Sequence, residues 1–210
     1  MKLYSYWRST TSYRVRIALH LKGLSFETVP VDLVKGDQKR DDYAALNPLA
    51  GVPTLVLDDG TALTQSMAIL DYLDAVYPDM TLLPNDPIER AKVRAAAQTI
   101  ALEIHPINNL KVGDFLKSDM GQTQDDVIRW MCEWMHRGFT AFQEQIDATG
   151  KFCFGDTLTQ ADLCLIPQLY NAHRWGLDLA PFVRLTDIEK NCLALPAFDA
   201  ARPENQPDAG

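Results

Sequence analysis

Residues 52–66 read Val-Pro-Thr-Leu-Val-Leu-Asp-Asp-Gly-Thr-Ala-Leu-Thr-Gln-Ser, and they are the most informative residues for the fold of the first half of the chain. Two short apolar runs flank an Asp-Gly pair, which is typical of an antiparallel β-hairpin. Gln65-Ser66 then opens a predicted helix that continues to Tyr77, with apolar residues on one face. The stretch therefore predicts a hairpin followed directly by a helix.

The residues before this hairpin predict two further strands and two helices. Leu3 to Tyr6 is a short apolar strand, and residues 13–22 form a helix that Gly23 ends. Phe26 to Leu33 alternates at the strand period, but Pro30 removes one ladder donor and favours an edge position. A short helix is expected within residues 35–46. Because a helix joins the first two strands, they are predicted to be parallel, and residues 1–80 form one α/β domain.

After the hairpin and its helix, strand patterns disappear. Pro78 to Pro87 contains three prolines and is interpreted as a linker between domains. Asp86-Pro87-Ile88-Glu89 fits an N-cap, a proline at the first helical position and a glutamate at the third. The helix that begins there is predicted to run to Lys111, with a bend at Pro106.

The rest of the chain is also predicted to be helical. A second long helix is expected over residues 124–148. Thr159 with Asp162, and Thr186 with Glu189, have the spacing of capping boxes at two later helix starts. Residues 87–210 are therefore predicted to form an all-helical domain.

The composition of the 210 residues limits the function classes. A hydrophobic content of 47% and a charged content of 23% are ordinary for a globular protein. A net charge of −8 argues against nucleic acid or an anionic membrane as the main partner. No apolar run reaches the length of about eighteen residues typical of a membrane span, and no apolar signal core follows Met1. Four cysteines without CxxC spacing suggest reduced packing residues in a cytoplasmic protein.

The chemistry-bearing stretch is Trp7-Arg8-Ser9-Thr10-Thr11-Ser12, between the first strand and the first helix. The first turn of a helix has unpaired backbone N–H groups and a partial positive charge, and nearby hydroxyls add donors. Together they form a pocket suited to a thiolate or carboxylate. Taken alone, the same residues are typical helix caps.

No nucleophilic triad, phosphate-binding loop or dinucleotide motif is present. The four histidines are widely spaced, and Cys132 with His136 supplies only two possible ligands, so no metal site is predicted. The sequence therefore shows no strong nucleophile among the side chains. This favours a mechanism in which a bound molecule supplies the nucleophile.

Three motifs resemble the glutathione transferases. Val52-Pro53 before a hairpin strand resembles their cis-proline, whose exposed backbone pairs with the cysteinyl unit of glutathione. Gln65-Ser66 resembles their clamp for the γ-glutamyl carboxylate. Residues 155–162 resemble their capping box. The order and spacing of these motifs identify the glutathione transferase fold, an α/β thioredoxin-like N-terminal domain plus an all-α C-terminal domain.

Within that family the opening turn is similar to the zeta class, which includes the maleylacetoacetate isomerases. That class has a Ser-Ser-Cys-Ser run before Arg-Val-Arg-Ile-Ala-Leu, and this chain has Ser9 to Ser12, with Thr11 in place of the cysteine, before residues 14–19. The run 105–109, His-Pro-Ile-Asn-Asn, resembles bacterial maleylpyruvate isomerases. The two arginines that follow there are Leu110 and Lys111 here, which puts one substrate contact in doubt.

The resemblance implies a glutathione-dependent cis–trans isomerase of a maleyl diacid, either maleylacetoacetate or maleylpyruvate. Glutathione would be the cofactor and a small dicarboxylate the substrate, with no metal, and a homodimer is carried over from the family. The implied catalytic residues are Ser9, Thr10 and Thr11, and the implied substrate-binding residues are Arg8, Arg174 and Lys111. The implied glutathione-binding residues are Ser9, Thr11, Gln38, Val52, Pro53, Gln65, Ser66, His105 and Asn109.

Several alternatives stay open at this point. A zeta-class transferase that conjugates or dehalogenates small electrophiles has the same motifs, and a non-catalytic module of the same fold would fail to bind glutathione. Arg174 is equally suited to a surface ion pair. Arg14 and Arg16 match the class motif but point in different directions on a helix, and both are interpreted as structural.

Overall fold

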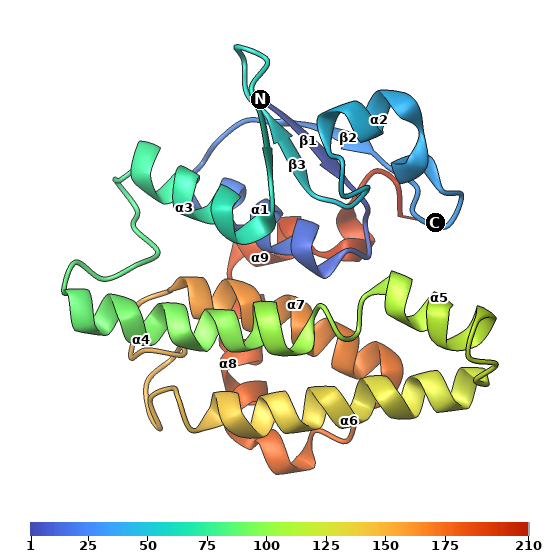
Figure 1. The fold of residues 1–210 in the computed structure, drawn as a ribbon. Coiled ribbons are helices and arrows are strands. Elements are labelled where there is room, and N and C mark those ends of the chain that lie inside the picture. Colours follow the sequence, from blue (N-terminus) through green and yellow to red (C-terminus); the bar gives the residue numbers. More distant parts are fainter. Residues whose placement is uncertain (210) are drawn as a thin grey trace. The chain divides into compact units, whose positions relative to one another are not determined.

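The computed structural model describes residues 1–209 and divides the chain into two compact units (Figure 1). The first unit consists of Met1–Thr81 together with the residues from Leu193 onward, and the second is Leu82–Cys192. The sequence predicted domains of 1–80 and 87–210, so the division differs at the C-terminal segment, which packs with the first unit. No helix within residues 1–209 is long and apolar enough to cross a membrane.

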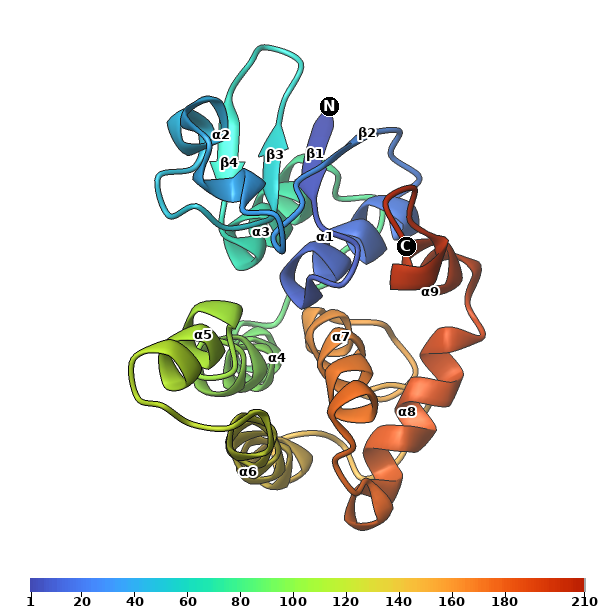
Figure 2. The ribbon, with the colours of Figure 1, turned by 90° about the vertical axis from the view of Figure 1, so that its right-hand side faces the viewer.

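The first unit contains a four-stranded sheet in the order β2-β1-β3-β4 (Figure 2). β1 (Lys2–Ser5) pairs in parallel with β2 (Glu27–Pro30), whereas β3 (Thr54–Val56) is antiparallel to β1 and to β4 (Ala62–Thr64). The predicted parallel pair, the edge position of the proline-containing strand and the hairpin are all confirmed.

Helices α1 (Thr10–Leu21) and α3 (Ser66–Val76) lie on the same side of this sheet (Figure 2). Gly23 has a φ of 64°, as expected for a glycine that ends α1. The apolar core between sheet and helices includes the buried side chains of Leu3, Leu55 and Ile69. The shorter elements of this unit are α2 (Asp41–Leu46), α9 (Pro196–Ala201) and 3-10 turns at Asp37–Lys39 and Pro203–Asn205.

Arg16 explains why the C-terminal segment joins the first unit. Its guanidinium is fully buried and donates to the carbonyl oxygens of Trp7 and Ala201, both at 3.0 Å. It also donates to the Ser5 hydroxyl at 3.0 Å. α9 packs directly against α1, so a single buried cation joins the loop after β1 to the end of the chain.

Within residues 82–192, the second unit, the regular elements are helices, and the loop before Gln160 contains one isolated β-bridge between Phe154 and Thr157. The helical elements of this unit are α4 (Pro87–Gln98), a π-helical segment (Thr99–Ile104), α5 (Leu110–Ser118), α6 (Gln124–Gln143), α7 (Gln160–Trp175), a 3-10 turn (Ala180–Phe182) and α8 (Val183–Leu193). α7 packs against both α4 and α6.

The prediction of one helix continuing to Lys111 is wrong. Regular α-helix ends at Gln98, a π-helical turn follows, and a new helix begins at Leu110. Pro106 has no N–H to continue the ladder, and the Asn109 side chain caps the new helix by accepting from the Lys111 N–H at 3.2 Å.

Two other helix boundaries also differ from the predictions. α6 ends at Gln143 rather than near residue 148. Thr186 and Glu189 do not form a capping box, because α8 already begins at Val183. The Thr186 hydroxyl instead donates to the Val183 carbonyl, and Glu189 accepts from His173 at 2.9 Å.

The capping box at the start of α7 is confirmed. The buried carboxylate of Asp162 accepts from the backbone N–H of Thr159 at 2.8 Å and from its hydroxyl at 2.9 Å. Its other oxygen accepts from the Cys153 N–H at 2.8 Å. Burial raises the pKa of Asp162, whereas these donors oppose the rise. The carboxylate therefore joins α7 to the loop that precedes it.

Replacing Asp162 by alanine should destabilise the protein by about 3 kcal/mol or more, because two buried backbone donors lose their acceptor. Chemical denaturation of Asp162→Ala would measure the change in the free energy of unfolding. Asp187→Ala, an exposed position on α8, is the control and should change that free energy by less than about 0.5 kcal/mol. Equal effects of the two substitutions would contradict this role of Asp162.

Candidate functional site

The predicted anion pocket is built on the first turn of α1. Ser9 is the N-cap residue, and its hydroxyl oxygen accepts from the Ser12 N–H at 3.2 Å. The Ser9 and Thr11 hydroxyl oxygens are 2.9 Å apart, and the Thr11 hydroxyl donates to the Val52 carbonyl at 2.8 Å. Ser9 therefore caps α1, as its position in the sequence indicates. The same Ser9 hydroxyl is also hydrogen-bonded to Thr11, which in turn donates to the Val52 carbonyl in the loop before β3. The third predicted hydroxyl, that of Thr10, is buried.

The Val52-Pro53 peptide bond is cis, as the sequence motif predicted. The loop before it is anchored by its backbone: the Gly51 carbonyl accepts from the Tyr43 hydroxyl at 2.5 Å and from the Asn47 side-chain amide at 2.8 Å. Sequence reasoning did not find Tyr43 or Asn47, since neither stands in a recognisable motif. The loop that carries Val52 is thus held both by α2 and by the hydroxyl of Thr11.

The second predicted anion-binding feature of this unit is the N-terminus of α3. Gln65, the N-cap residue of α3, has a φ of 68°, and its side chain makes no capping hydrogen bond. The Ser66 hydroxyl accepts from Nη1 of Arg14 at 3.4 Å, and Arg14 is buried. A buried cation behind a helix N-terminus adds to the partial positive charge already there. Arg14, interpreted as structural from the sequence, therefore supports the predicted clamp.

Two other predicted residues of the first unit lie on separate loops. Gln38 is buried in the 3-10 turn after β2, where its amide donates to the Leu33 carbonyl at 3.4 Å. Its carbonyl oxygen has no partner within residues 1–209. Arg8 is half-buried, with its guanidinium 4.0 Å from the centre of the Trp7 ring. This stacking orients the guanidinium without using its hydrogen-bond donors.

The remaining predicted residues belong to the second unit. His105 and Asn109 are one turn apart, with 3.4 Å between His105 Nε2 and Asn109 Nδ2. Lys111 is exposed on the first turn of α5. Arg174 is exposed near the end of α7, with its guanidinium 4.5 Å from the centre of the Trp175 ring. Of this group, the structure brings together the two residues predicted to contact glutathione.

The residues considered as metal ligands have other partners. The Cys132 thiol donates to the Trp175 carbonyl at 3.5 Å, and the His136 ring packs edge-on against Phe182. Across residues 1–209 no group of three or more His, Cys, Asp or Glu side chains has a metal-binding arrangement.

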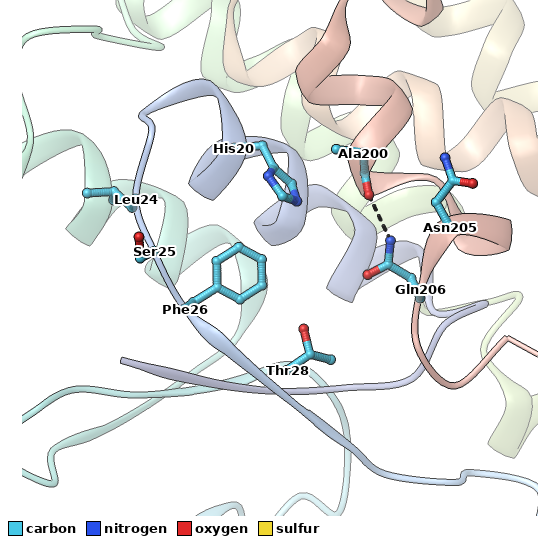
Figure 3. Close-up of a pocket in the computed structure, with 8 residues that line it drawn as sticks. All are labelled: His20, Leu24, Ser25, Phe26, Thr28, Ala200, Asn205 and Gln206. Atoms are coloured by element: carbon cyan, nitrogen blue, oxygen red, sulfur yellow. Dashed lines mark hydrogen bonds between the residues drawn. The ribbon is translucent and has the colours of Figure 1, made fainter.

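A separate pocket of about 470 Å³ lies on the first unit, and it contains none of the predicted site residues (Figure 3). His20 and Phe26 form one side of it, with their ring centres 5.4 Å apart. Burial, together with the positive charge of Arg16, lowers the pKa of His20. The other lining residues are Leu24, Ser25, Thr28, Ala200, Asn205 and Gln206.

The lowered pKa of His20 makes stability depend on pH. Below its ordinary pKa of 6.5 the unfolded chain binds a proton that the folded protein resists, so the free energy of unfolding should fall as the solution is acidified. His20→Gln removes this contribution. Urea denaturation of both proteins at about pH 7.5 and pH 5.5 should show a smaller acid-induced loss for the variant. Equal losses would contradict the assignment.

Comparisons with known proteins agree with this geometry. Residues 8–76 match the N-terminal domain of glutathione S-transferase. A probable maleylacetoacetate isomerase of Vibrio cholerae is 43% identical over 99% of this chain and 97% of its own length.

Two solved structures have the same architecture over the whole chain. The holo structure of maleyl pyruvate isomerase, a bacterial glutathione S-transferase of the zeta class, has a TM-score of 0.97 at 40% identity and covers 100% of both chains. A maleylacetoacetate isomerase of Anaeromyxobacter dehalogenans, with dicarboxyethyl glutathione and citrate bound in its active site, has a TM-score of 0.89 at 41% identity. It covers 100% of this chain and 97% of its own.

Proposed function

Because the chain belongs to the maleylacetoacetate isomerase family, the zeta class of the glutathione transferases, we propose that it is an isomerase with glutathione as cofactor. The reaction converts a maleyl diacid from the cis to the trans isomer. The substrate class comprises maleylacetoacetate and maleylpyruvate. The observation that carries the proposal is the pair of hydroxyls at the start of α1, linked by Thr11 to the carbonyl before the cis-proline. This arrangement fits a thiol held at a helix N-terminus.

Bound glutathione supplies a thiolate that adds to the carbon–carbon double bond, after which rotation and elimination yield the trans isomer. The protein must keep that sulfur ionised near neutral pH, and a free thiol titrates near ~8.5. Ser9 is the first candidate to donate to the sulfur, because its hydroxyl can turn from Thr11 toward a ligand. Thr11 is the second. The N-terminal dipole of α1 lowers the thiol pKa further.

The rest of glutathione has matching partners on the first unit. The N-terminus of α3, with Ser66 and the Arg14 guanidinium that donates to it, suits the γ-glutamyl carboxylate. Val52, before the cis-proline, offers backbone groups to the cysteinyl unit. The unpartnered carbonyl oxygen of Gln38 suits a donor such as an amide N–H.

The substrate carboxylates require cations. We assign them to Arg8, Arg174 and Lys111, because a guanidinium binds a carboxylate through two parallel hydrogen bonds and lysine supplies a point charge. Stacking on Trp7 and Trp175 restricts the two guanidinium planes, which reduces the entropy lost on binding. A substrate negative charge that develops during the reaction is stabilised by the same cations.

We also propose that the protein is a cytoplasmic homodimer. The free state of all four cysteines supports a reducing compartment. Sedimentation equilibrium would test the dimer directly, since a monomer would have the mass of 23.6 kDa.

The decisive experiment follows the loss of maleylpyruvate and of maleylacetoacetate, each with and without glutathione. Turnover that requires glutathione is expected, and the ratio of the two kcat/KM values would name the substrate. If glutathione binds and neither substrate is converted, the isomerase is refuted. Conjugation of small electrophiles would then be the activity to measure.

Ser9→Ala should lower kcat/KM by about 10- to 100-fold, the loss expected for one hydrogen bond to a charged sulfur. Thermal unfolding of the same variant would show the smaller cost of the lost helix cap, about 1 kcal/mol. Ser9→Thr keeps a hydroxyl and a cap, so it is the matched control and should retain most activity. If Ser9→Ala stays active and Thr11→Val does not, the thiolate donor is Thr11 instead.

A further inference from the structure

Two hydrogen bonds join α6 to the turn that precedes α5. The indole Nε1 of Trp130 donates to the Ile107 carbonyl at 3.1 Å. In the opposite direction, the side-chain amide of Asn108 donates to the Met131 carbonyl at 3.1 Å. Adjacent residues of α6 are thus bonded to adjacent residues of the turn, and the pair of bonds fixes both its position and its orientation.

α6 is suited to act as a rigid support. Its start is held by a capping box between Thr123 and Asp126, and the spacing of its buried residues is three or four. One further contact fits α6 to the π-helical segment. A Cβ added to Gly138 would lie 2.2 Å from Cγ1 of Ile104, which is fully buried, so the glycine is what lets the two segments approach. The buried residues of α6 are Val127, Met131, Met135, Phe139 and Phe142.

The two ends of the supported turn carry residues of the proposed site. The N–H of His105 bonds to the Ile100 carbonyl at 3.0 Å, the closing bond of the π-helical segment. Asn109 lies 3.4 Å from His105 and caps α5 next to Lys111. A shift of Ile107 and Asn108 would therefore change the positions of His105 and Asn109 relative to each other.

We propose that Trp130 and Asn108 are positioning residues for glutathione binding: through the Ile107 and Met131 carbonyls they hold the turn that orients His105 and Asn109. The inference rests on the proposed function, in which His105 and Asn109 contact glutathione. Neither Trp130 nor Asn108 needs to touch a ligand. The two hydrogen bonds hold the turn equally in the ground state and in the transition state. Removing one of them should therefore weaken glutathione binding equally in both states, which raises the KM for glutathione and leaves kcat unchanged.

Trp130→Phe tests this by removing the N–H donor while keeping an aromatic ring. We expect the KM for glutathione to rise about threefold to tenfold, as for one neutral hydrogen bond, with little change in kcat. Trp134→Phe is the matched control. Trp134 lies one turn along α6 with its ring 5.7 Å from that of Trp130, and its indole N–H makes no bond to the part of the chain described by the structure.

Asn108→Ala separates positioning from stability. The Asn108 carbonyl oxygen is buried with no partner among residues 1–209, so alanine removes one hydrogen bond and also one costly unpaired acceptor. The melting temperature should change little while the KM for glutathione rises. A variant that was only less stable would lose active enzyme, and therefore apparent kcat, without a change in KM.

Calorimetric titration of glutathione into wild type and the three variants makes the result independent of turnover. Weaker binding by Trp130→Phe and Asn108→Ala than by Trp134→Phe supports the inference. Affinities equal to that of the control overturn it, even if the isomerase activity is established. Failure of the wild-type protein to bind glutathione overturns both this inference and the proposed function. Binding without isomerisation refutes the proposed function alone.

Discussion

The buried guanidinium of Arg16 is the interaction on which the first unit depends. Burying a charge is costly unless its hydrogen bonds are satisfied, and Arg16 donates to backbone carbonyls on both sides of it. The Trp7 carbonyl lies two residues before Ser9, so the same cation that retains α9 also fixes the loop leading to the proposed catalytic hydroxyls. The Arg16 side chain therefore connects the C-terminal helix α9 to the loop that leads to the proposed catalytic residues.

Arg14 and Arg16 illustrate how two cations on one helix divide their roles. Residues two apart on a helix project in different directions, and here Arg14 contacts Ser66 whereas Arg16 contacts the loop after β1. The protein has a net charge of −8, yet it buries these two positive charges, one of them against Ser66 at the start of α3. Local placement of charge, rather than the overall sign, makes the first unit suited to an anionic tripeptide.

The segment after α4 shows a different way to build a site. Sequence periodicity indicated a helix that continues through residues 99–111, with a bend at Pro106. The structure contains a π-helical turn, an irregular turn and a newly capped helix instead. π-helical turns occur frequently at functional sites. Here His105 Nε2 and Asn109 Nδ2, at the two ends of the irregular turn, lie 3.4 Å apart, and α6 is hydrogen-bonded to the turn between them.

Features that depend on near neighbours in the chain could be predicted from the residues alone. The hairpin follows from an Asp-Gly pair between apolar runs, the end of α1 from Gly23, and the start of α7 from Thr159 and Asp162. The hydroxyl-rich turn was likewise readable from residues 9–12. These features are controlled by backbone propensities and hydrogen bonds that span only a few residues.

Features that depend on contacts between distant residues could be seen only in the folded protein. The C-terminal segment belongs with the first unit because the Ala201 carbonyl bonds to Arg16, 185 positions earlier. The π-helical turn fits because Gly138, on another helix, leaves room for Ile104. Periodicity and capping motifs do not identify such partners. Each of these contacts depends on complementary shape or charge between distant residues, and it forms only when the chain packs.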